Sequence, residues 1–244
     1  MNIGILGAGN IGGTLAQKLA AQGHSVKLAN SRGAASLRDL AARIGVTAAD
    51  QTDAVKDVEV IIIAVPLANV PQLAELLSHV PKSTVLIDTT NYYPFRDGEL
   101  PELEAGQPES LWVSEQLGRP VVKAWNAVLA ETLRNRGKPA GVAERIALPV
   151  AGDDAGGKQI AAQLVHDSGF DALDAGPLTE SWRQQPGTPA YCTELTLPQL
   201  RTALAAADQQ RAPLNRDSAM EHLMVLGRTP THDEIVQNNR AASA

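Results

Sequence analysis

The sequence predicts an α/β protein in which helices cover both faces of a doubly wound parallel sheet. Three observations support this fold class. Short apolar segments alternate with segments whose apolar residues recur at helical spacing, from residue 1 to about residue 124. The links between these segments are short, which is typical of parallel strands joined by right-handed crossovers. The length of 244 residues suits a large domain followed by a smaller one.

The individual elements follow from apolar runs and from the residues that end them. Gly23 stands where the first helix should stop, because glycine readily adopts the left-handed conformation of a helix C-terminus. The segment 91–107 is rich in proline, glycine and glutamate, and we expect it to form a long loop. The expected strands span 1–6, 25–29, 58–65, 84–88 and 121–124, and the expected helices span 14–20, 36–44 and 68–80.

The pattern changes near residue 127, which predicts a second, smaller α+β unit. A helix at 154–168 lies between strands at 145–150 and 170–174, and Asp154 is expected to cap it. Another helix is expected at 197–207, with an apolar stripe narrow enough for a dimer contact. We therefore predict two domains, residues 1–126 and residues 127–244, the second ending in a flexible tail past residue 238.

Composition excludes several classes of function. The 21 basic and 27 acidic residues leave a net charge of −6, which argues against binding to nucleic acid or to anionic lipid. The single cysteine, Cys192, excludes a disulfide framework, and the five histidines are not spaced as metal ligands, so no metal is expected. No stretch reaches the ~20 apolar residues of a membrane helix, and no leader precedes the first strand. These features predict a cytoplasmic protein.

A glycine-rich turn, Gly7-Ala8-Gly9-Asn10-Ile11-Gly12, joins the first strand to the first helix. This is the context of the dinucleotide-binding fingerprint of Rossmann folds. Gly7 permits the tight turn, Gly9 lets the backbone approach a diphosphate, and Gly12 lets the helix pack on the strand. The amides of Asn10, Ile11 and Gly12 would then point at the phosphates. The alternative is a turn with a purely structural role.

The end of the second strand predicts which dinucleotide is bound. NAD enzymes usually place a carboxylate there, whereas this chain has Asn30-Ser31-Arg32-Gly33. A guanidinium can bind a ribose 2′-phosphate in a forked geometry, and a hydroxyl can donate to it. We predict that NADP(H) is preferred, with Ser31 and Arg32 contacting the extra phosphate. The alternative is that Arg32 is a solvated loop residue.

Three further strand ends are expected to line the nicotinamide end of the crevice, because open α/β sheets bind ligands at the carboxyl ends of their strands. The first of these ends carries Ala64, Val65 and Pro66. Asn91 and Asn126 follow the other two and could hydrogen-bond the ribose, the carboxamide or the substrate. Either asparagine could instead cap a turn.

Several segments, taken in order, resemble the coenzyme F420-dependent NADP reductase family over roughly residues 1–180. They are residues 7–12, Asn30-Ser31-Arg32, Ala64-Val65-Pro66, Val122-Lys123-Ala124-Trp125-Asn126, residues 149–154 and residues 173–178. The resemblance implies a Rossmann domain with a small C-terminal domain, a homodimer, and hydride transfer between NADPH and a deazaflavin. By matched position, Ser31 and Arg32 would hold the 2′-phosphate. Archaeal members often carry a lysine where this chain has Ser36, and residues beyond 180 do not match them.

The acceptor site is predicted from large planar and cationic side chains. Trp125, Trp182 and Arg183 are the candidates, because a ring stacks on a flat acceptor and an arginine binds an anionic group. Core packing is the alternative for each tryptophan.

No proton donor stands out, so no catalytic residue is assigned. Lys123 would serve if it lay beside the nicotinamide, although pairing with a carboxylate is the stronger expectation, and Tyr92, Tyr93 and Tyr191 are weaker candidates. We therefore expect NADP(H)-dependent hydride transfer to a planar acceptor such as F420 or a flavin. The alternatives are an NADPH-dependent imine or carbonyl reductase, with a tyrosine or water as acid, and a non-catalytic NADPH sensor.

Overall fold

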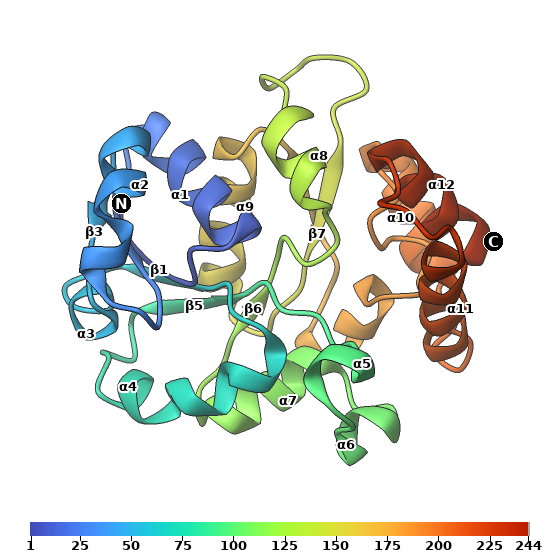
Figure 1. Cartoon of the computed structure of the whole chain (residues 1–244), viewed down its shortest axis with the longest axis horizontal. Coiled ribbons are helices and arrows are strands. Elements are labelled where there is room, and N and C mark those ends of the chain that lie inside the picture. Colours follow the sequence, from blue (N-terminus) through green and yellow to red (C-terminus); the bar gives the residue numbers. More distant parts are fainter. Residues whose placement is uncertain (244) are drawn as a thin grey trace.

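A computed structural model describes residues 1–243 and contains the predicted parallel sheet (Figure 1). Its six strands follow the order β3-β2-β1-β4-β5-β6, and every neighbouring pair is parallel. The order reverses direction between β1 and β4, which is the place where doubly wound sheets bind ligands. The strands are β1 (Asn2–Leu6), β2 (Ser25–Ala29), β3 (Thr47–Ala48), β4 (Val60–Ile63), β5 (Val85–Asp88) and β6 (Val122–Lys123).

Helices cover both faces of this sheet, and the alternation of side chains along the strands separates two cores. One core joins Ile3 and Ile62 to α1 (Asn10–Ala21) and α9 (Ala155–Asp167). The other joins Ile61 and Leu86 to the opposite layer of helices. That layer comprises α3 (Gln51–Ala54), η2 (Leu67–Leu73), α4 (Ala74–Ser78) and α7 (Glu109–Leu117).

Two of the predicted helices begin as tight 3₁₀ turns. The helix expected at 36–44 is η1 (Ala34–Leu37) followed by α2 (Arg38–Ile44). The helix expected at 68–80 is η2 followed by α4, with Pro71 inside the 3₁₀ part. Proline lacks an amide hydrogen for the α-helical bond, which accounts for the irregular start. Gly23 has a φ of +86° at the end of α1, as predicted.

The C-terminal part contains a two-stranded parallel sheet, followed by helices that form one end of the molecule (Figure 1). The sheet pairs β7 (Ala147–Val150) with β8 (Asp171–Asp174) around α9, and Asp154 caps α9 through the amide of Gly157. Ala151 bridges to Lys123, which joins the small sheet to the large one. The remaining helices are α8 (Ala130–Asn135), η3 (Leu178–Gln184), α10 (Leu197–Ala205), α11 (Ala212–Val225) and α12 (His232–Ala242).

Three expectations from the sequence differ from this structure. The segment 91–107 contains two short helices, α5 (Pro94–Asp97) and α6 (Pro101–Glu104), each begun by a proline. The tail is helical to Ala242, because Thr231 and Glu234 form a capping box at the start of α12. The apolar face of α10 packs inside the chain against β7 and β8, so it is not free for a dimer contact. Within residues 1–243, no helix is long and apolar enough to cross a membrane.

Candidate active site

The glycine-rich turn forms an open cradle of backbone at the end of β1. A side-chain carbon at Gly7 would lie 2.2 Å from the carbonyl oxygen of Ala64, and one at Gly12 would lie 1.9 Å from the carbonyl oxygen of Gly7. Gly9 differs, because a side chain there would meet nothing within 4 Å. Gly7 and Gly12 are therefore required for packing, whereas Gly9 leaves room beside the first turn of α1.

The amino end of α1 supplies the positive pole of this cradle. Gly9 is the N-cap, no side chain caps the helix, and its first turn contains no acidic residue. The first amides of a helix lack partners within it, so those of Asn10, Ile11 and Gly12 are available to an anion. A bare glycine beside uncapped amides fits the diphosphate of a dinucleotide.

A cavity of about 470 Å³ runs along this edge of the sheet. It connects the glycine turn with the ends of β2 and β4, which are the positions predicted for the two halves of a dinucleotide. The polar residues Gln51, Asn69 and Gln72 also line the cavity, and they were not predicted from the sequence. The three-residue spacing of Asn69 and Gln72 on η2 could have identified those two. The cavity is lined by Gly7, Ala8, Gly9, Asn30, Ser31, Arg32, Gln51, Ala64, Val65, Pro66, Asn69, Gln72 and Leu73.

The loop after β2 holds Arg32 at one end of this cavity. Its backbone amide donates to Oδ1 of Asn30 at 2.8 Å, while its guanidinium has no hydrogen-bond or ion-pair partner within the described chain. Ser36 accepts from Nδ2 of Asn30 at 3.0 Å and donates to the carbonyl of Gly33, so it braces the loop. Asp50, a carboxylate tied to this loop, accepts from the amide of Ala34 and does not line the cavity.

Asn91 and Asn126 meet at the ends of β5 and β6, as expected, but they bond mainly to each other. Nδ2 of Asn126 donates to Oδ1 of Asn91 at 3.0 Å, and Nδ2 of Asn91 donates to the carbonyl of Asn126 at 2.9 Å. Gln184 of η3 extends this amide chain by donating to Oδ1 of Asn126 at 2.8 Å. The chain therefore ties the two strand ends to the C-terminal part. Oε1 of Gln184 and Oγ1 of Thr90 are buried there and accept or donate no hydrogen bond within residues 1–243.

A fully buried ion cluster lies beneath these strand ends. Nζ of Lys123 lies 3.2 Å from Oε2 of Glu109 and 3.7 Å from Oδ2 of Asp88, and it donates to the carbonyl of Thr90 at 3.2 Å. Ser110 donates to Asp88 at 2.6 Å. Burial raises the pKa of Glu109, and Lys123 partly offsets this rise. The expected pairing of Lys123 with a carboxylate is confirmed, and the sequence did not identify Glu109 as a partner.

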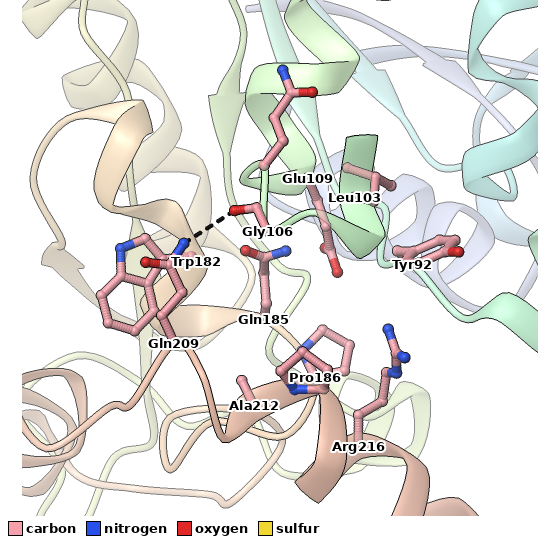
Figure 2. A pocket seen from close by; sticks show the side chains of 12 residues that line it. Tyr92, Leu103, Gly106, Glu109, Trp182, Gln185, Pro186, Gln209, Ala212 and Arg216 are labelled. Carbon is pink, nitrogen blue, oxygen red and sulfur yellow. Dashed lines mark hydrogen bonds between the residues drawn. The ribbon is translucent and has the colours of Figure 1, made fainter. Parts of the chain in front are cut away.

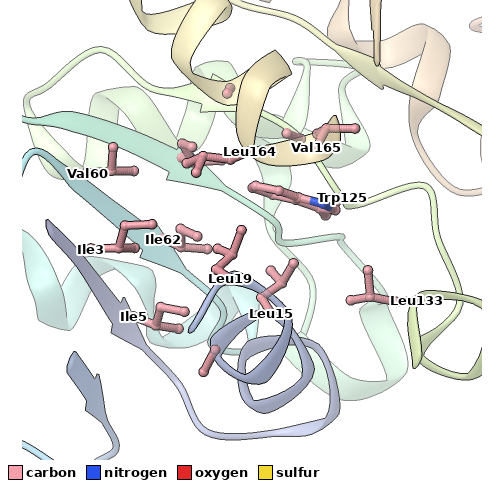
Figure 3. Packing of buried hydrophobic residues seen from close by; sticks show 14 of the residues in the cluster. Ile3, Ile5, Leu15, Leu19, Val60, Ile62, Trp125, Leu133, Leu164 and Val165 are labelled. Carbon is pink, nitrogen blue, oxygen red and sulfur yellow. The ribbon is translucent and has the colours of Figure 1, made fainter. Parts of the chain in front are cut away.

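Trp125 is a core residue, which corrects its prediction as an acceptor-stacking ring. It is 1% exposed and packs between α1 and α9, next to Leu19 and Leu164 (Figure 3). Its indole Nε1 donates to Oγ of Ser168 at 3.1 Å. With both faces covered and its one donor satisfied, the ring offers no surface to a ligand.

Trp182 and Arg183 lie on η3, away from the glycine turn. The guanidinium of Arg183 lies 4.3 Å from the centre of the Trp182 ring and is 2.7 Å from Oε2 of Glu180. Binding an acceptor's anionic group would therefore require Arg183 to leave these partners. Trp182 lines a separate cavity of about 50 Å³, too small for a three-ring acceptor. Figure 2 shows this cavity, with Trp182 on one side and Tyr92 and Arg216 on the other.

The tyrosines considered as proton donors also have partners within the chain. Tyr92 donates to Oε1 of Glu104 at 2.8 Å, and burial is the main reason that its pKa rises to about 12. Tyr93 donates to the hydroxyl of Tyr191 at 2.9 Å, and burial raises the pKa of both. None of the three lines the cavity at the glycine turn.

The fold, the glycine turn and the reversal of strand order between β1 and β4 define an α/β protein of the dinucleotide-binding class. The family model "NADP oxidoreductase coenzyme F420-dependent" matches residues 2–92. A stretch of 103 residues is 39% identical to the protein YjhV of Escherichia coli (strain K12) and covers 42% of this chain and 75% of YjhV.

Solved structures agree with this assignment. The protein SMa0349 from Sinorhizobium meliloti is 30% identical, with a TM-score of 0.68 over 80% of this chain and 95% of SMa0349. A protein from Arthrobacter sp. FB24 described as an F420-dependent NADP reductase shares the fold, at 23% identity and a TM-score of 0.61 over 94% of this chain and 96% of that one. The chain belongs to the F420-dependent NADP oxidoreductase family, and its class of chemistry is NAD(P)-dependent reduction.

Proposed function

We propose that this protein transfers hydride between NADP(H) and a planar acceptor such as coenzyme F420 or a flavin. The observation that carries the proposal is the cavity at the glycine turn, which combines a bare Gly9, uncapped helix amides and an Arg32 guanidinium without a partner among residues 1–243. The end of β2 has a guanidinium where NAD enzymes place a carboxylate, and this favours a ribose that carries a 2′-phosphate.

Different residues of the cavity would hold different parts of the nucleotide. Ser31 and Arg32 would bind the 2′-phosphate, and Gly9 with the amides of α1 would bind the diphosphate. The other half of the nucleotide would extend past Val65 toward the ends of β5 and β6. Bound NADPH supplies the hydride from its nicotinamide ring, and the protein contributes a dry surface that holds the ring and acceptor together.

The family description supports a deazaflavin as acceptor, and a flavin has the same flat shape. A flat acceptor needs stacking room beside the nicotinamide more than it needs a strong acid. Phe95, which is 63% exposed and lies 5.5 Å from the Tyr93 ring between centroids, offers an aromatic surface near the end of β5. Trp182 remains a proposed acceptor contact only if the 50 Å³ cavity opens when ligand binds.

Anaerobic oxidation of NADPH tests the acceptor directly. The panel comprises F420, FMN, FAD, a ferric chelate, and representative imines and carbonyls. Turnover with F420 or a flavin at the highest kcat/KM supports the proposal. Turnover with imines or carbonyls alone replaces it with a carbonyl or imine reductase, and tight NADPH binding without any turnover replaces it with an NADPH sensor.

The homodimer expected from the family resemblance is also a proposal. Leu214, Met224 and Val225 on α11 are at least 63% exposed, and large apolar side chains on a surface often mark a contact. Sedimentation equilibrium at micromolar concentration tests it, since a monomer mass across that range would contradict it.

A further inference from the structure

The buried ion cluster lies at the end of the sheet where the nicotinamide half of the nucleotide would be. Lys123 and Asp88 are the last residues of β6 and β5, and they are partners in the strand register. The adenosine half is assigned to β2, on the far side of β1 in the strand order. A nucleotide that crosses the glycine turn from β2 must therefore continue over β4 toward β5 and β6. This placement depends on the proposed function.

Within the cluster, Lys123 contacts both the loop that follows β5 and the carboxylate of Glu109. Its ammonium group has three N–H bonds, and its neighbours are the carbonyl of Thr90, the carboxylate of Glu109 and the carboxylate of Asp88. Asp88 is further held by Ser110 and by the amide of Thr90, which donates to its Oδ1 at 2.9 Å. Asp88 therefore has three donors around it, whereas Lys123 is the one side-chain partner of Glu109 among residues 1–243.

Glu109 also faces a second compartment. It is 3% exposed and lines the 50 Å³ cavity together with Gln185 and Arg216 (Figure 2). A water molecule needs about 10–15 Å³ of cavity, so this one can hold several. Glu109 can thus exchange protons with water in this cavity, while Lys123 contacts its carboxylate from the end of β6.

We propose that the Glu109–Lys123 pair is a proton port for the hydride reaction, holding a proton while the nicotinamide is reduced and releasing it when the nicotinamide is oxidised. The reduced ring is neutral and the oxidised ring is a cation, so oxidation places a positive charge near the pair and favours ionised Glu109. Glu109 gives up this proton to water in the 50 Å³ cavity, and it takes a proton back from the cavity when the nicotinamide is reduced again.

The charges that face Glu109 set the pH range of this response. They are Lys123 of β6, Asp88 of β5 and Arg216 of α11, with the Tyr93 hydroxyl further away. Burial raises the pKa of the Glu109 carboxyl, so its proton is retained to a higher pH than on a surface glutamate. An added cation lowers that pKa again, which couples nucleotide oxidation to proton release.

Binding of the two forms of the nucleotide tests the port without an acceptor. Calorimetry gives Kd for NADP⁺ and for NADPH between pH 6 and pH 9. Their 2′-phosphates titrate alike and cancel in the ratio Kd(NADP⁺)/Kd(NADPH). We expect this ratio to fall by about tenfold as pH rises, because each unit of pKa shift is a tenfold change in affinity. NADP⁺ binding should also release protons, measured as heats that depend on the buffer.

Two variants test whether the pH dependence of the Kd ratio comes from Glu109. Glu109→Gln keeps the shape and a contact to Lys123 but removes the titrating carboxyl, and it should make the ratio independent of pH. Glu104→Gln removes an exposed carboxylate that contacts Tyr92 rather than Lys123, and it should leave the slope unchanged. A ratio that is flat in the native protein, or a slope that survives in Glu109→Gln, overturns the proposal.

The outcomes distinguish a failure of the proton port from a failure of the proposed function on which it rests. Absence of binding for both nucleotides contradicts the proposed function itself. Binding of both without buffer-dependent heat contradicts only the proton port. If Glu109→Gln does not fold, the count of protons released by the native protein still decides, since fewer than about 0.1 per nucleotide at every pH would contradict a coupled group.

Discussion

The two ends of the sheet edge are built in different ways. At β1, β2 and β4 the surface is open and made largely of backbone, with a bare Gly9, uncapped helix amides and an Arg32 guanidinium that has no partner in the described part of the chain. At β5 and β6 it is closed and made of side chains, with the Asn91–Asn126–Gln184 amide chain above a buried ion cluster. The open end can bind a ligand that brings the negative charge with it. The closed end already contains both charges of its ion pairs.

This difference assigns nucleotide binding to the open end and proton exchange to the closed end. Backbone amides and a surface arginine can hold phosphates whatever the redox state of the ring, because the phosphates do not change. Groups that respond to the ring must be buried, where charge interactions are strong.

The largest effect is expected from Lys123→Met, which leaves Glu109 and Asp88 buried without their cation. Removing one partner of a buried ion pair costs about 3–5 kcal/mol, and urea unfolding measures this loss. The matched control is Lys158→Met, because Lys158 pairs at 2.8 Å with Asp174, whose side chain is 64% exposed. That control should cost less than about 1 kcal/mol. Equal losses for the two variants would contradict the view that burial makes this ion pair costly to break.

Gly12→Ala should abolish tight nucleotide binding, because the new methyl group would lie 1.9 Å from the carbonyl oxygen of Gly7 and push α1 away. We expect Kd for NADPH to rise by about 100-fold or more, equivalent to about 2.7 kcal/mol, with a lower Tm. Gly13→Ala is the control, since its methyl group would have its nearest contact at 3.7 Å. Equal Kd values for NADPH in the two variants would contradict the placement of the nucleotide at the glycine turn.

Arg32→Ala should weaken NADPH binding by about tenfold to 100-fold, the usual range for a charge-assisted hydrogen bond to phosphate. NADH, which has no 2′-phosphate, should bind with unchanged Kd. Arg201→Ala removes an exposed arginine on α10 and should change neither value. An equal loss for both nucleotides would mean that Arg32 does not contact the 2′-phosphate.

The smallest effect is expected where α12 docks. Glu194 accepts from Thr132 at 2.7 Å and lies 2.7 Å from His232. Burial by itself raises the pKa of Glu194, but these two partners hold it below its ordinary value of 4.5. The stabilisation is therefore present above pH 4.5 and lost as the pH falls toward the folded-state pKa.

Glu194→Gln should lower the unfolding free energy by about 1 kcal/mol at pH 7 and flatten its loss between pH 5 and pH 3. Urea unfolding at each pH measures both. An unchanged acid limb would mean that other carboxylates control acid stability.

The open end of the sheet was predictable because its signals are local. The glycine spacing, the strand before it and the absence of an acid after β2 all lie within 33 residues. The closed end was not, because its contacts join distant parts of the chain. Glu109 belongs to α7, which has a weak apolar pattern, and Gln184 ends the short segment η3 between Pro177 and Pro186. Trp125 was misassigned because its neighbours in sequence do not reveal that α9 covers it.

The domain boundary at residue 127 remains a prediction, although the main core continues past it through Leu148, Leu164 and Phe170. The tail was misread for a related reason. The capping box of α12 is a local signal, but the helix is half polar and is held by Arg240, which donates to the carbonyl of Thr193 at 2.7 Å. Such docking contacts cannot be inferred from the composition of a tail.

We propose that a 2′-phosphorylated dinucleotide lies along the glycine turn with its extra phosphate at Arg32. Calorimetric titration of the native protein with NADPH and with NADH at one pH tests this placement. We expect one site per chain and an NADPH Kd at least tenfold below that of NADH. Equal affinities would contradict the assignment of Arg32, and no heat from either nucleotide would contradict the site as a whole.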